Sequence, residues 1–389
     1  MSLFLEKARE AALILITELY HDTSASILSI NEIPFAGANS FIAKSFGPKE
    51  LGHLVFQFTW KSKDKSGTEK IKLKVSKSGA VSAGAINMYR SVDLVLGTQM
   101  EKLKHNVFDN HNHREANLLA LDDLVLKKYT PKFLLNWYDP ETGITGFATE
   151  FLSNTIMMDS VGKEHLWTPA FINSVLDGFA EIHASFLGRT ISIPASCHIN
   201  DFFAPDKEET LNWYWHKAEA AARLNPQIFT QERMKCLKEG LRMLGHFMHA
   251  IPKTDLTLSH GNSGIRNICL RTTGNGTKLC AYDWEFAAAQ VPMRDIVEFL
   301  TSTLTGEIDL VQRDIYINNY MELFQFHTNT KVDREKFNAY SEFSMMFYFF
   351  QTVLNLCVRK EALRPPNLSV LIENCFRIFE KNKKNKIAA

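Results

Sequence analysis

The chain has 389 residues, of which 45% are hydrophobic and 22% are charged. This length exceeds that of an ordinary single domain, so we expect two packed lobes, and the composition is that of a folded protein. Lys and Arg total 44 against 43 Asp and Glu, giving a formal net charge of +1. A dedicated nucleic-acid binder is disfavoured, because the chain has no global positive field.

The cysteines and the apolar segments also limit the class of protein. The six cysteines are widely spread without a C-x-x-C pair, which indicates neither a zinc site nor a disulfide framework and suits a reducing compartment. Residues 1–20 fit an amphipathic helix better than a signal peptide. The most apolar stretch, 345–358, is interrupted by Gln351 and Asn355 and is shorter than the roughly 20 residues that cross a bilayer. We expect a cytoplasmic protein with no membrane partner.

The first part of the chain has the pattern of an antiparallel sheet. The expected strands, separated by polar turns, are 33–36, 41–46, 54–60 and 70–76. Apolar residues in the second half of the segment 83–126 have helical spacing. Residues 132–138 and 144–152 predict a hairpin, because the intervening Asp-Pro and Gly favour chain reversal. We expect this lobe to end near Ser153.

The remainder is mostly helical from Pro169 onward, with one exception. Short strands are expected at 267–270 and 278–283, joined by a turn that contains Gly274-Asn275-Gly276. The expected fold class is therefore α+β, with an antiparallel sheet lobe followed by a larger helical lobe.

The most specific motif lies at this hairpin. It runs from Ser259 to Ile268 with the sequence SHGNSGIRNI, and Asp283 follows in the sequence AYDWE. Phosphoryl transfer needs a group beside the acceptor hydroxyl and oxygen ligands that hold Mg²⁺ against the phosphates. A loop residue, an amide five positions later and a carboxylate after the next strand can converge in this way. Any one of these residues is more simply explained by a polar loop, but their combination favours a catalytic site.

The motif resembles that of the aminoglycoside phosphotransferase and choline kinase group of small-molecule kinases. Their loop reads His-Gly/Asn-Asp, four residues, Asn, and their metal-binding Asp follows a hydrophobic strand. The resemblance implies a bilobal protein-kinase-like fold, with a nucleotide-binding lobe at 1–153 and a helical lobe at 154–389 that carries the catalytic loop and the acceptor site. It further implies ATP and Mg²⁺ as cofactors, Asn267 and Asp283 as metal ligands, and a small-molecule hydroxyl as the acceptor.

The resemblance places the catalytic position at Asn262, with His260 beside it in the catalytic loop. The family carries an aspartate at this position, which accepts the proton of the acceptor, and an amide cannot do so. Three interpretations stay open: a kinase that relies on Asn or another base, a nucleotide-binding or regulatory pseudokinase, and a chain in which Asp was replaced by Asn. The presence of both magnesium candidates favours the phosphotransferase.

The resemblance also implies nucleotide contacts in the first lobe. The turn AGANSF resembles the first-hairpin loop of the family, where small residues let backbone amides approach phosphate oxygens, and it implies contacts from Gly37, Asn39 and Ser40. Residues Glu150 and Leu152 match the hinge that offers backbone groups to adenine.

A lysine and a glutamate complete the expected nucleotide site. Alternation along the strand 71–75 places Lys72 and Lys74 on one face, and the resemblance favours Lys74 for neutralising phosphate, with Glu115 as its partner. Structural roles near the catalytic loop are expected for His183, Arg294 and Asp295.

The acceptor is not identified by the sequence. Aromatic residues at 213–216 and 343–350 could wall an acceptor pocket, although core packing is the commoner explanation. No acidic cluster is dense enough to indicate a polycationic aminoglycoside. Choline-like, amino-alcohol, sugar and natural-product hydroxyls therefore stay open, and the oligomeric state is not indicated.

Overall fold

The computed structural model describes residues 3–21, 23–34, 52–77, 80–107, 111–197, 207–274, 276–304, 310–359, 364 and 368–388. Contacts between Cα atoms divide the chain into two compact units. The first unit comprises Met1–Ala85 and Phe108–Ser153, and the second comprises Ile86–Val107 and Asn154–Ala389.

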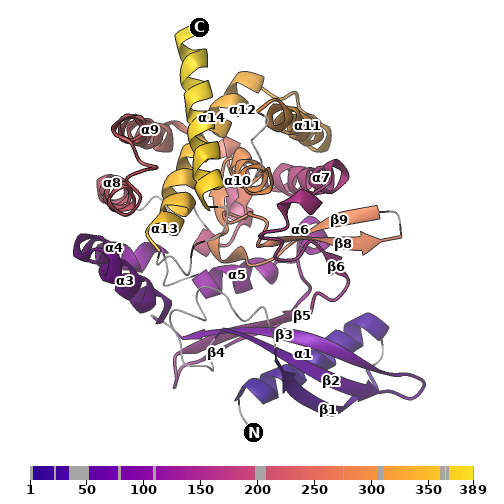
Figure 1. The fold of residues 1–389 in the computed structure, drawn as a ribbon. Helices are drawn as coiled ribbons and strands as arrows, with labels where there is room; N and C mark the ends of the chain where they lie inside the picture. The colour runs from indigo at the N-terminus through magenta and orange to yellow at the C-terminus, as the bar shows by residue number, and fades with distance from the viewer. Residues whose placement is uncertain are drawn as a thin grey trace. The chain divides into compact units, whose positions relative to one another are not determined.

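The first unit contains a five-stranded antiparallel sheet, as the sequence predicts. Its strands lie in the order β1-β2-β3-β5-β4, with the bounds β1 Ser26–Ile33, β2 Gly52–Lys61, β3 Ser66–Lys77, β4 Phe133–Asp139 and β5 Ile144–Glu150. The helix α1 (Leu3–Tyr20) packs on this sheet (Figure 1). Its buried residues recur at helical spacing, which confirms the expected amphipathic helix: Ala8, Ala11, Ala12, Leu15 and Ile16. Two shorter helices, α5 (His111–Leu119) and α6 (Leu124–Tyr129), belong to the same unit.

Strand β1 lies earlier in the chain than the sequence indicates. It spans Ser26–Ile33, whereas the strand predicted at 33–36 overlaps it only at Ile33. It pairs with β2 with a register shift between Ile27 and Ser29. Most of its side chains are exposed or half-exposed, so the apolar alternation that identifies a strand is weak. The strands expected at 54–60 and 70–76 lie inside β2 and β3, while the one expected at 41–46 lies outside the described residues.

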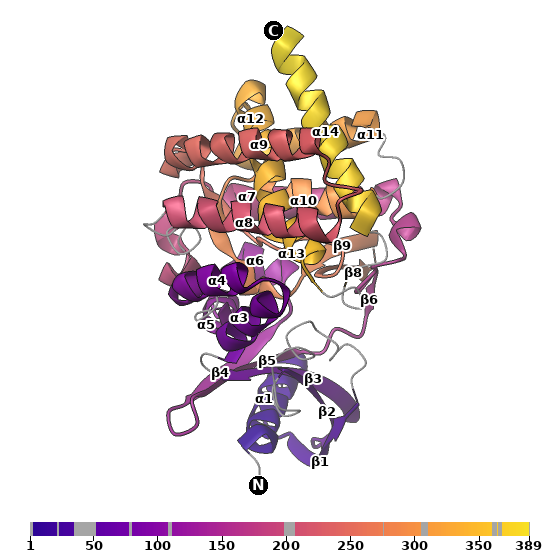
Figure 2. The same ribbon diagram turned by 60° about the vertical axis from the view of Figure 1, so that its left-hand side comes forward.

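The second unit is mostly helical. Figure 2 shows α8 and α9 running side by side. The helices that lie wholly within this unit are α4 Leu94–Val107, α7 Pro169–Phe186, α8 Lys207–Leu224, α9 Gln231–Ala250, α10 Met293–Thr303, α11 Leu310–Thr328, α12 Arg334–Tyr348, α13 Leu354–Cys357 and α14 Leu368–Ala388. Short 3₁₀ turns are found at Glu164–Leu166, Thr190–Ser192, Ala195–Cys197, Lys253–Asp255 and Trp284–Phe286.

Two small antiparallel sheets lie among these helices. Strands β8 (Ile268–Thr273) and β9 (Gly276–Ala281) form the expected hairpin, to which β6 (Thr155–Ile156) adds a third strand. Strand β7 (Thr257–Ser259) pairs with β10 (Ala288–Gln290). This second pairing brings the start of α10 close to the loop that follows β7, which positions the candidate site.

The segment 86–107 groups with the second unit, whereas the sequence placed it in the first lobe. The helix α3 (Ala80–Val92) begins in the first unit, but Tyr89 on it packs edge-on against Trp213, with ring centroids 5.8 Å apart. Its hydroxyl also donates to Asn355 Oδ1 at 2.8 Å. These contacts join residues distant in the sequence, so local patterns do not reveal them.

The apolar stretch 345–358 is a buried core segment, as expected. It comprises the end of α12, a π-helical turn at Phe349–Val353 and α13. Within the described part of the chain, we found no helix with the length and apolarity that crossing a membrane requires.

Candidate active site

The candidate catalytic loop connects β7 to the β8–β9 hairpin. The backbone N–H of Tyr282 donates to the carbonyl of Asn267 at 3.0 Å, which extends the hairpin ladder by one step beyond Ile268 and Ala281. Asn267 therefore lies beside the residue that precedes Asp283. The geometry brings together the two positions that the sequence proposed as metal ligands.

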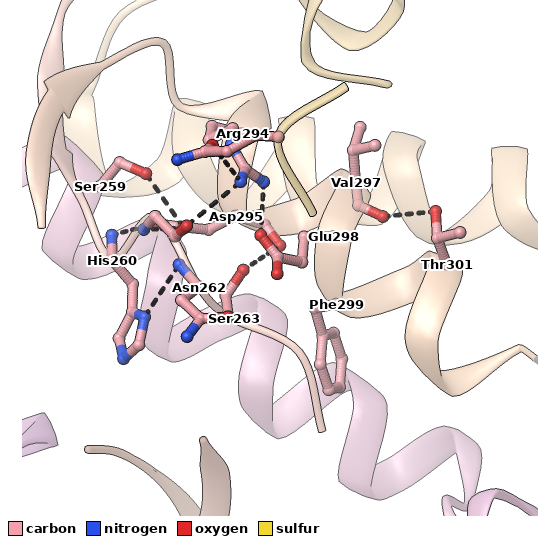
Figure 3. A network of polar contacts seen from close by, with 12 residues as sticks. Ser259, His260, Asn262, Ser263, Arg294, Asp295, Val297, Glu298, Phe299 and Thr301 are labelled. Carbon is pink, nitrogen blue, oxygen red and sulfur yellow. Dashed lines mark hydrogen bonds and ion pairs between the residues drawn. The ribbon is translucent and has the colours of Figure 1, made fainter. Parts of the chain in front are cut away.

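A single carboxylate organises the start of the loop. Asp295, in the first turn of α10, accepts hydrogen bonds from the backbone N–H groups of His260 at 2.7 Å and Gly261 at 3.0 Å, and from Ser259 Oγ at 3.0 Å. His183 Nε2 on α7 lies 3.1 Å from the same carboxylate (Figure 3 shows the loop contacts). Asp295 has the structural role that we expected for it, and so has His183.

The partners of Asp295 also set its ionisation. Burial favours the neutral acid and by itself would raise the pKa of Asp295. The interactions of the carboxylate with His183, and with the ring and backbone N–H of His260, outweigh burial and lower this pKa to about 2. The second ring nitrogen of His183, Nδ1, bonds the hydroxyl of Tyr320 at 2.7 Å. A buried chain of polar groups thus runs from α11 to the loop.

His260 is held at both ring nitrogens. Its Nδ1 accepts from the backbone N–H of Asn262 at 3.3 Å, and its Nε2 lies 2.9 Å from the carbonyl of Tyr282. Because Nδ1 accepts and a carbonyl can only accept, the ring is the neutral tautomer with its proton on Nε2. Burial lowers the pKa of His260, although the Asp295 charge opposes this. His260 therefore links the loop to the residue before Asp283.

The backbone at Gly261 requires glycine. Its φ is +73°, and a Cβ placed there would lie 2.2 Å from the carbonyl oxygen of Phe286. The tight turn at Gly261 directs the next residue, Asn262, away from the Asp295 carboxylate (Figure 3).

The side chains of Asn262 and Asn267 are the polar groups that this loop leaves available. Asn262 is half-buried, and its side-chain amide forms no hydrogen bond with any described residue. The side-chain N–H₂ of Asn267 donates to the carbonyl of Asn262 at 2.9 Å, which leaves Oδ1 of Asn267 without a hydrogen bond to the described residues. An amide oxygen of this kind is a suitable ligand for a hard cation.

Asp283 lies directly after β9 with a left-handed backbone, at φ 66° and ψ 56°. This conformation is uncommon for a residue other than glycine, and such residues cluster at functional sites. Among the described residues, no group of three or more His, Cys, Asp or Glu could hold a metal ion. Asp283 and Asn267 together supply one carboxylate and one amide, which fits Mg²⁺, because this ion usually keeps several waters and binds through one or two protein groups and phosphates.

A buried ion pair lies in the first unit. Lys74 on β3 and Glu115 on α5 are 2.6 Å apart, and both side chains are nearly inaccessible to solvent. Lys74, rather than Lys72, is therefore the lysine paired with Glu115, as the sequence predicts. A lysine held in this way presents a fixed charge in a poorly solvated place.

Lys74→Met should lower the free energy of unfolding by about 3 to 5 kcal/mol, because it leaves the carboxylate of Glu115 buried without its cation. The double variant Lys74→Met, Glu115→Leu should recover most of this loss, since an apolar pair of similar size replaces both charges. Both variants should bind nucleotide less tightly than the native chain, because neither has the Lys74 charge. Chemical denaturation and nucleotide titration measure the two effects, and a double variant that binds nucleotide as the native chain does would contradict the role of Lys74.

Neither protein-family models nor curated protein sequences gave a match. Among solved structures, the chain is similar to an ethanolamine kinase from Plasmodium vivax, with 12% identity and a TM-score of 0.49 over 91% of this chain and 83% of that one. It is also similar to a microcompartment-associated aminopropanol kinase, with 9% identity and a TM-score of 0.48 over 96% and 98% of the two chains. A putative aminoglycoside phosphotransferase from Ralstonia eutropha has 13% identity and a TM-score of 0.44 over 95% and 98%.

Each of these structures is that of a protein described as a small-molecule kinase or phosphotransferase, the class that the sequence motif resembles.

Other residues named from the sequence have less support. Gly37, Asn39 and Ser40 lie outside the described residues. Glu150 uses Oε1 to accept from the backbone N–H of Lys132 at 2.8 Å, a contact that joins β5 to the start of β4. The hinge role of Glu150 and Leu152 stays a prediction.

The aromatic residues of α8 belong to the core. Trp213 and Tyr214 are buried, and the ammonium of the buried Lys217 lies 3.8 Å and 4.7 Å from their ring centroids. Burial lowers the pKa of Lys217 well below its ordinary value. These two ring faces contact the chain's own lysine, which supports core packing over an acceptor pocket at this place.

Sequence reasoning gave Arg294 a structural role but missed its partner Glu298 behind the loop. Arg294 and Glu298 on α10 form a buried ion pair of 2.5 Å, and burial, despite the Arg294 charge, raises the pKa of Glu298 to about 7. Their i, i+4 spacing was the available signal, but it is equally typical of exposed helix pairs.

Proposed function

We propose that the chain transfers a phosphoryl group from ATP to a hydroxyl of a small molecule, with Asn262 at the acceptor position. One observation carries this proposal: the side chain of Asn267 bonds the backbone of Asn262 at 2.9 Å, while the backbone of Asn267 bonds that of Tyr282 at 3.0 Å, beside Asp283. These bonds join Asn262 to Asn267 and join Asn267 to the residue before Asp283, which supports one shared site for the acceptor and for Mg²⁺.

In this proposal the residues divide the work of phosphoryl transfer. Asn267 and Asp283 would hold Mg²⁺, which when bound offsets the charge of the phosphates. Lys74, fixed by Glu115, neutralises a phosphate oxygen. Asn262 orients the acceptor hydroxyl through its free amide. We assign His260 a positioning role in place of the catalytic role expected from the sequence, because both of its ring nitrogens are occupied.

The acceptor oxygen attacks the γ-phosphorus and the bond to the β,γ-bridging oxygen breaks. The hydroxyl proton requires a destination other than Asn262, since an amide oxygen is not basic. In a loose transition state the attacking hydroxyl stays largely protonated until late, so the proton passes to a transferred phosphate oxygen or to water. General-base help is worth about 10² to 10⁴-fold, and positioning and electrostatics supply the larger share.

The second candidate function is a nucleotide-binding pseudokinase without transfer activity. Asn262 itself favours it, because the side chain lacks a proton-accepting carboxylate. None of the six cysteines, all of which lie in the described part of the chain, forms a disulfide, which supports our further proposal that the chain works in a reducing compartment such as the cytoplasm.

A panel of hydroxylated small molecules, covering amino alcohols, sugars and natural products, tests the proposal with the native chain and radiolabelled ATP. We expect Mg²⁺-dependent phosphorylation of at least one class. Binding of Mg²⁺-ATP without phosphorylation of any acceptor would favour the pseudokinase.

A further inference from the structure

Residues of one helix, α10, hold the loop on both sides of Asn262. Arg294 Nη2 donates to the carbonyl of Gly261 at 3.1 Å. Ser263 Oγ donates to the carbonyl of Asp295 at 2.9 Å, and the backbone of Ser263 favours the ionised form of the Glu298 carboxylate. Arg294 and Glu298 are one helical turn apart on α10, and they pair with each other through Nη1 and Oε2 (Figure 3). The residues before and after Asn262 thus both interact with this buried ion pair.

This ion pair is better suited to fixing geometry than to adding stability. The side chains of Arg294 and Glu298 are 0% and 2% exposed, and burying two charges costs about as much as their attraction returns. Hydrogen bonds with a charged partner are, however, shorter and more directional than neutral ones. The pair therefore restricts the orientation of the loop more than it stabilises the unit.

A third residue holds Arg294 in place. Gln351 Oε1 accepts from Arg294 Nη2 at 3.1 Å, and Gln351 lies in the π-helical turn Phe349–Val353. Turns of this kind insert into α-helices at places where a side chain or carbonyl must be redirected, often at functional sites. The same turn offers the carbonyl of Phe350 to Lys217 at 2.6 Å. The π turn is thus bonded to the helix that carries the loop's ion pair and to α8.

We propose that Arg294 and Glu298 are positioning residues for Asn262, and that Gln351 of the π turn fixes Arg294 in the orientation this requires. Their mechanical effect on the loop is independent of any activity. Their effect on phosphoryl transfer rests on the function proposed above.

Amide hydrogen exchange of the full chain tests the mechanical effect without an acceptor. Arg294→Met should speed exchange at the Asn262 amide by about tenfold or more, because it removes a charged hydrogen-bond donor from the preceding carbonyl. Glu298→Gln should speed exchange at the Ser263 amide, because it removes the carboxylate charge that interacts with the Ser263 backbone. Gln351→Leu leaves both charges in place and should speed amide exchange at the same positions by a smaller factor. This variant still tests the proposal if one of the charge variants folds poorly.

Arg313→Met is the matched control. Arg313 is a buried arginine on α11 that donates to Ser341 Oγ at 3.1 Å, and it makes none of the recorded contacts with the loop. The variant Arg313→Met should destabilise the unit about as much as Arg294→Met does, while amide exchange at Asn262 and Ser263 stays unchanged. Exchange at these two amides that is equal in Arg294→Met and in Arg313→Met would overturn the proposal.

Single-turnover phosphate transfer tests the consequence for chemistry. Gln351→Leu should slow transfer by about tenfold while nucleotide affinity stays native, which a general loss of structure would not do. The positioning role would be overturned if Gln351→Leu transferred phosphate as fast as the native chain. It would also be overturned if the nucleotide affinity fell by the same factor as the transfer rate. If the native chain transfers no phosphate, the proposed function fails, and the exchange measurements still decide whether the ion pair holds the loop.

Discussion

Replacing Asp283 with Ala is expected to abolish the Mg²⁺-dependent part of nucleotide binding. Asp283 is the carboxylate of the proposed metal pair, and Asn267 contributes only a neutral oxygen. Loss of groups that merely support a ligand costs about 10 to 100-fold in metal affinity, so loss of the charged ligand itself should cost at least about 100-fold. Titration of nucleotide with and without Mg²⁺ measures the difference.

The appropriate control is an acidic residue away from the loop. Asp177 on α7 is half-exposed and bonds His327 at 3.0 Å, so Asp177→Ala should leave Mg²⁺-dependent binding intact. A chain with Asp283→Ala that still binds nucleotide more tightly in Mg²⁺ than in its absence would count against the metal site. In that event Glu285, which is buried two residues further on, would become the candidate ligand.

Replacing Asp295 with Asn should lower the free energy of unfolding by about 3 to 5 kcal/mol. The carboxylate receives two donors on each oxygen: Ser259 and Gly261 on Oδ1, and His183 and His260 on Oδ2. An amide of the same shape turns its own N–H₂ toward two of these donors, which leaves them buried and unpaired. Chemical denaturation of the two chains measures the loss.

The pH dependence of this loss identifies the carboxylate charge as its cause. The folded state lowers the pKa of Asp295 from 3.8 to about 2, so the charge stabilises the fold at neutral pH and this contribution disappears as pH falls from about 4 to 2. The difference in free energy of unfolding between the native chain and Asp295→Asn should therefore become smaller as the pH falls. A difference independent of pH, or no greater than that of Asp177→Asn, would show that Asp295 does not brace the loop through its charge.

The sequence predicted the parts of the site that depend on short spacing. The five-residue step from Asn262 to Asn267 and the following hairpin are local features, and the ladder contact at Tyr282 follows from them. The pairing of Lys74 with Glu115 was also predicted, because strand alternation restricted the choice to two lysines and the family resemblance favoured Lys74.

The sequence did not reveal contacts between elements far apart along the chain. The occupied ring nitrogens of His260 depend on the turn at Gly261 and on the placement of Tyr282, so an isolated His-Gly sequence could not show that both nitrogens are bonded within the fold. The contact of Arg294 with Gln351 spans 57 residues and requires a π-helical turn, for which the apolar pattern of this stretch gives no signal. The contact of Lys217 with two aromatic rings could not be predicted either, because the burial of this lysine depends on how α8 packs in the folded unit.

Single-turnover transfer of the γ-phosphate by three forms of the chain tests the central claim most directly. With an acceptor in place, the native chain should transfer phosphate, and Asn262→Asp should match or exceed it because a carboxylate adds a proton acceptor. Asn262→Ala should transfer about 10 to 100-fold more slowly, since the acceptor hydroxyl loses its orienting amide. Transfer that is fast in the native chain and unchanged in Asn262→Ala would contradict the account, because the acceptor would then lie elsewhere.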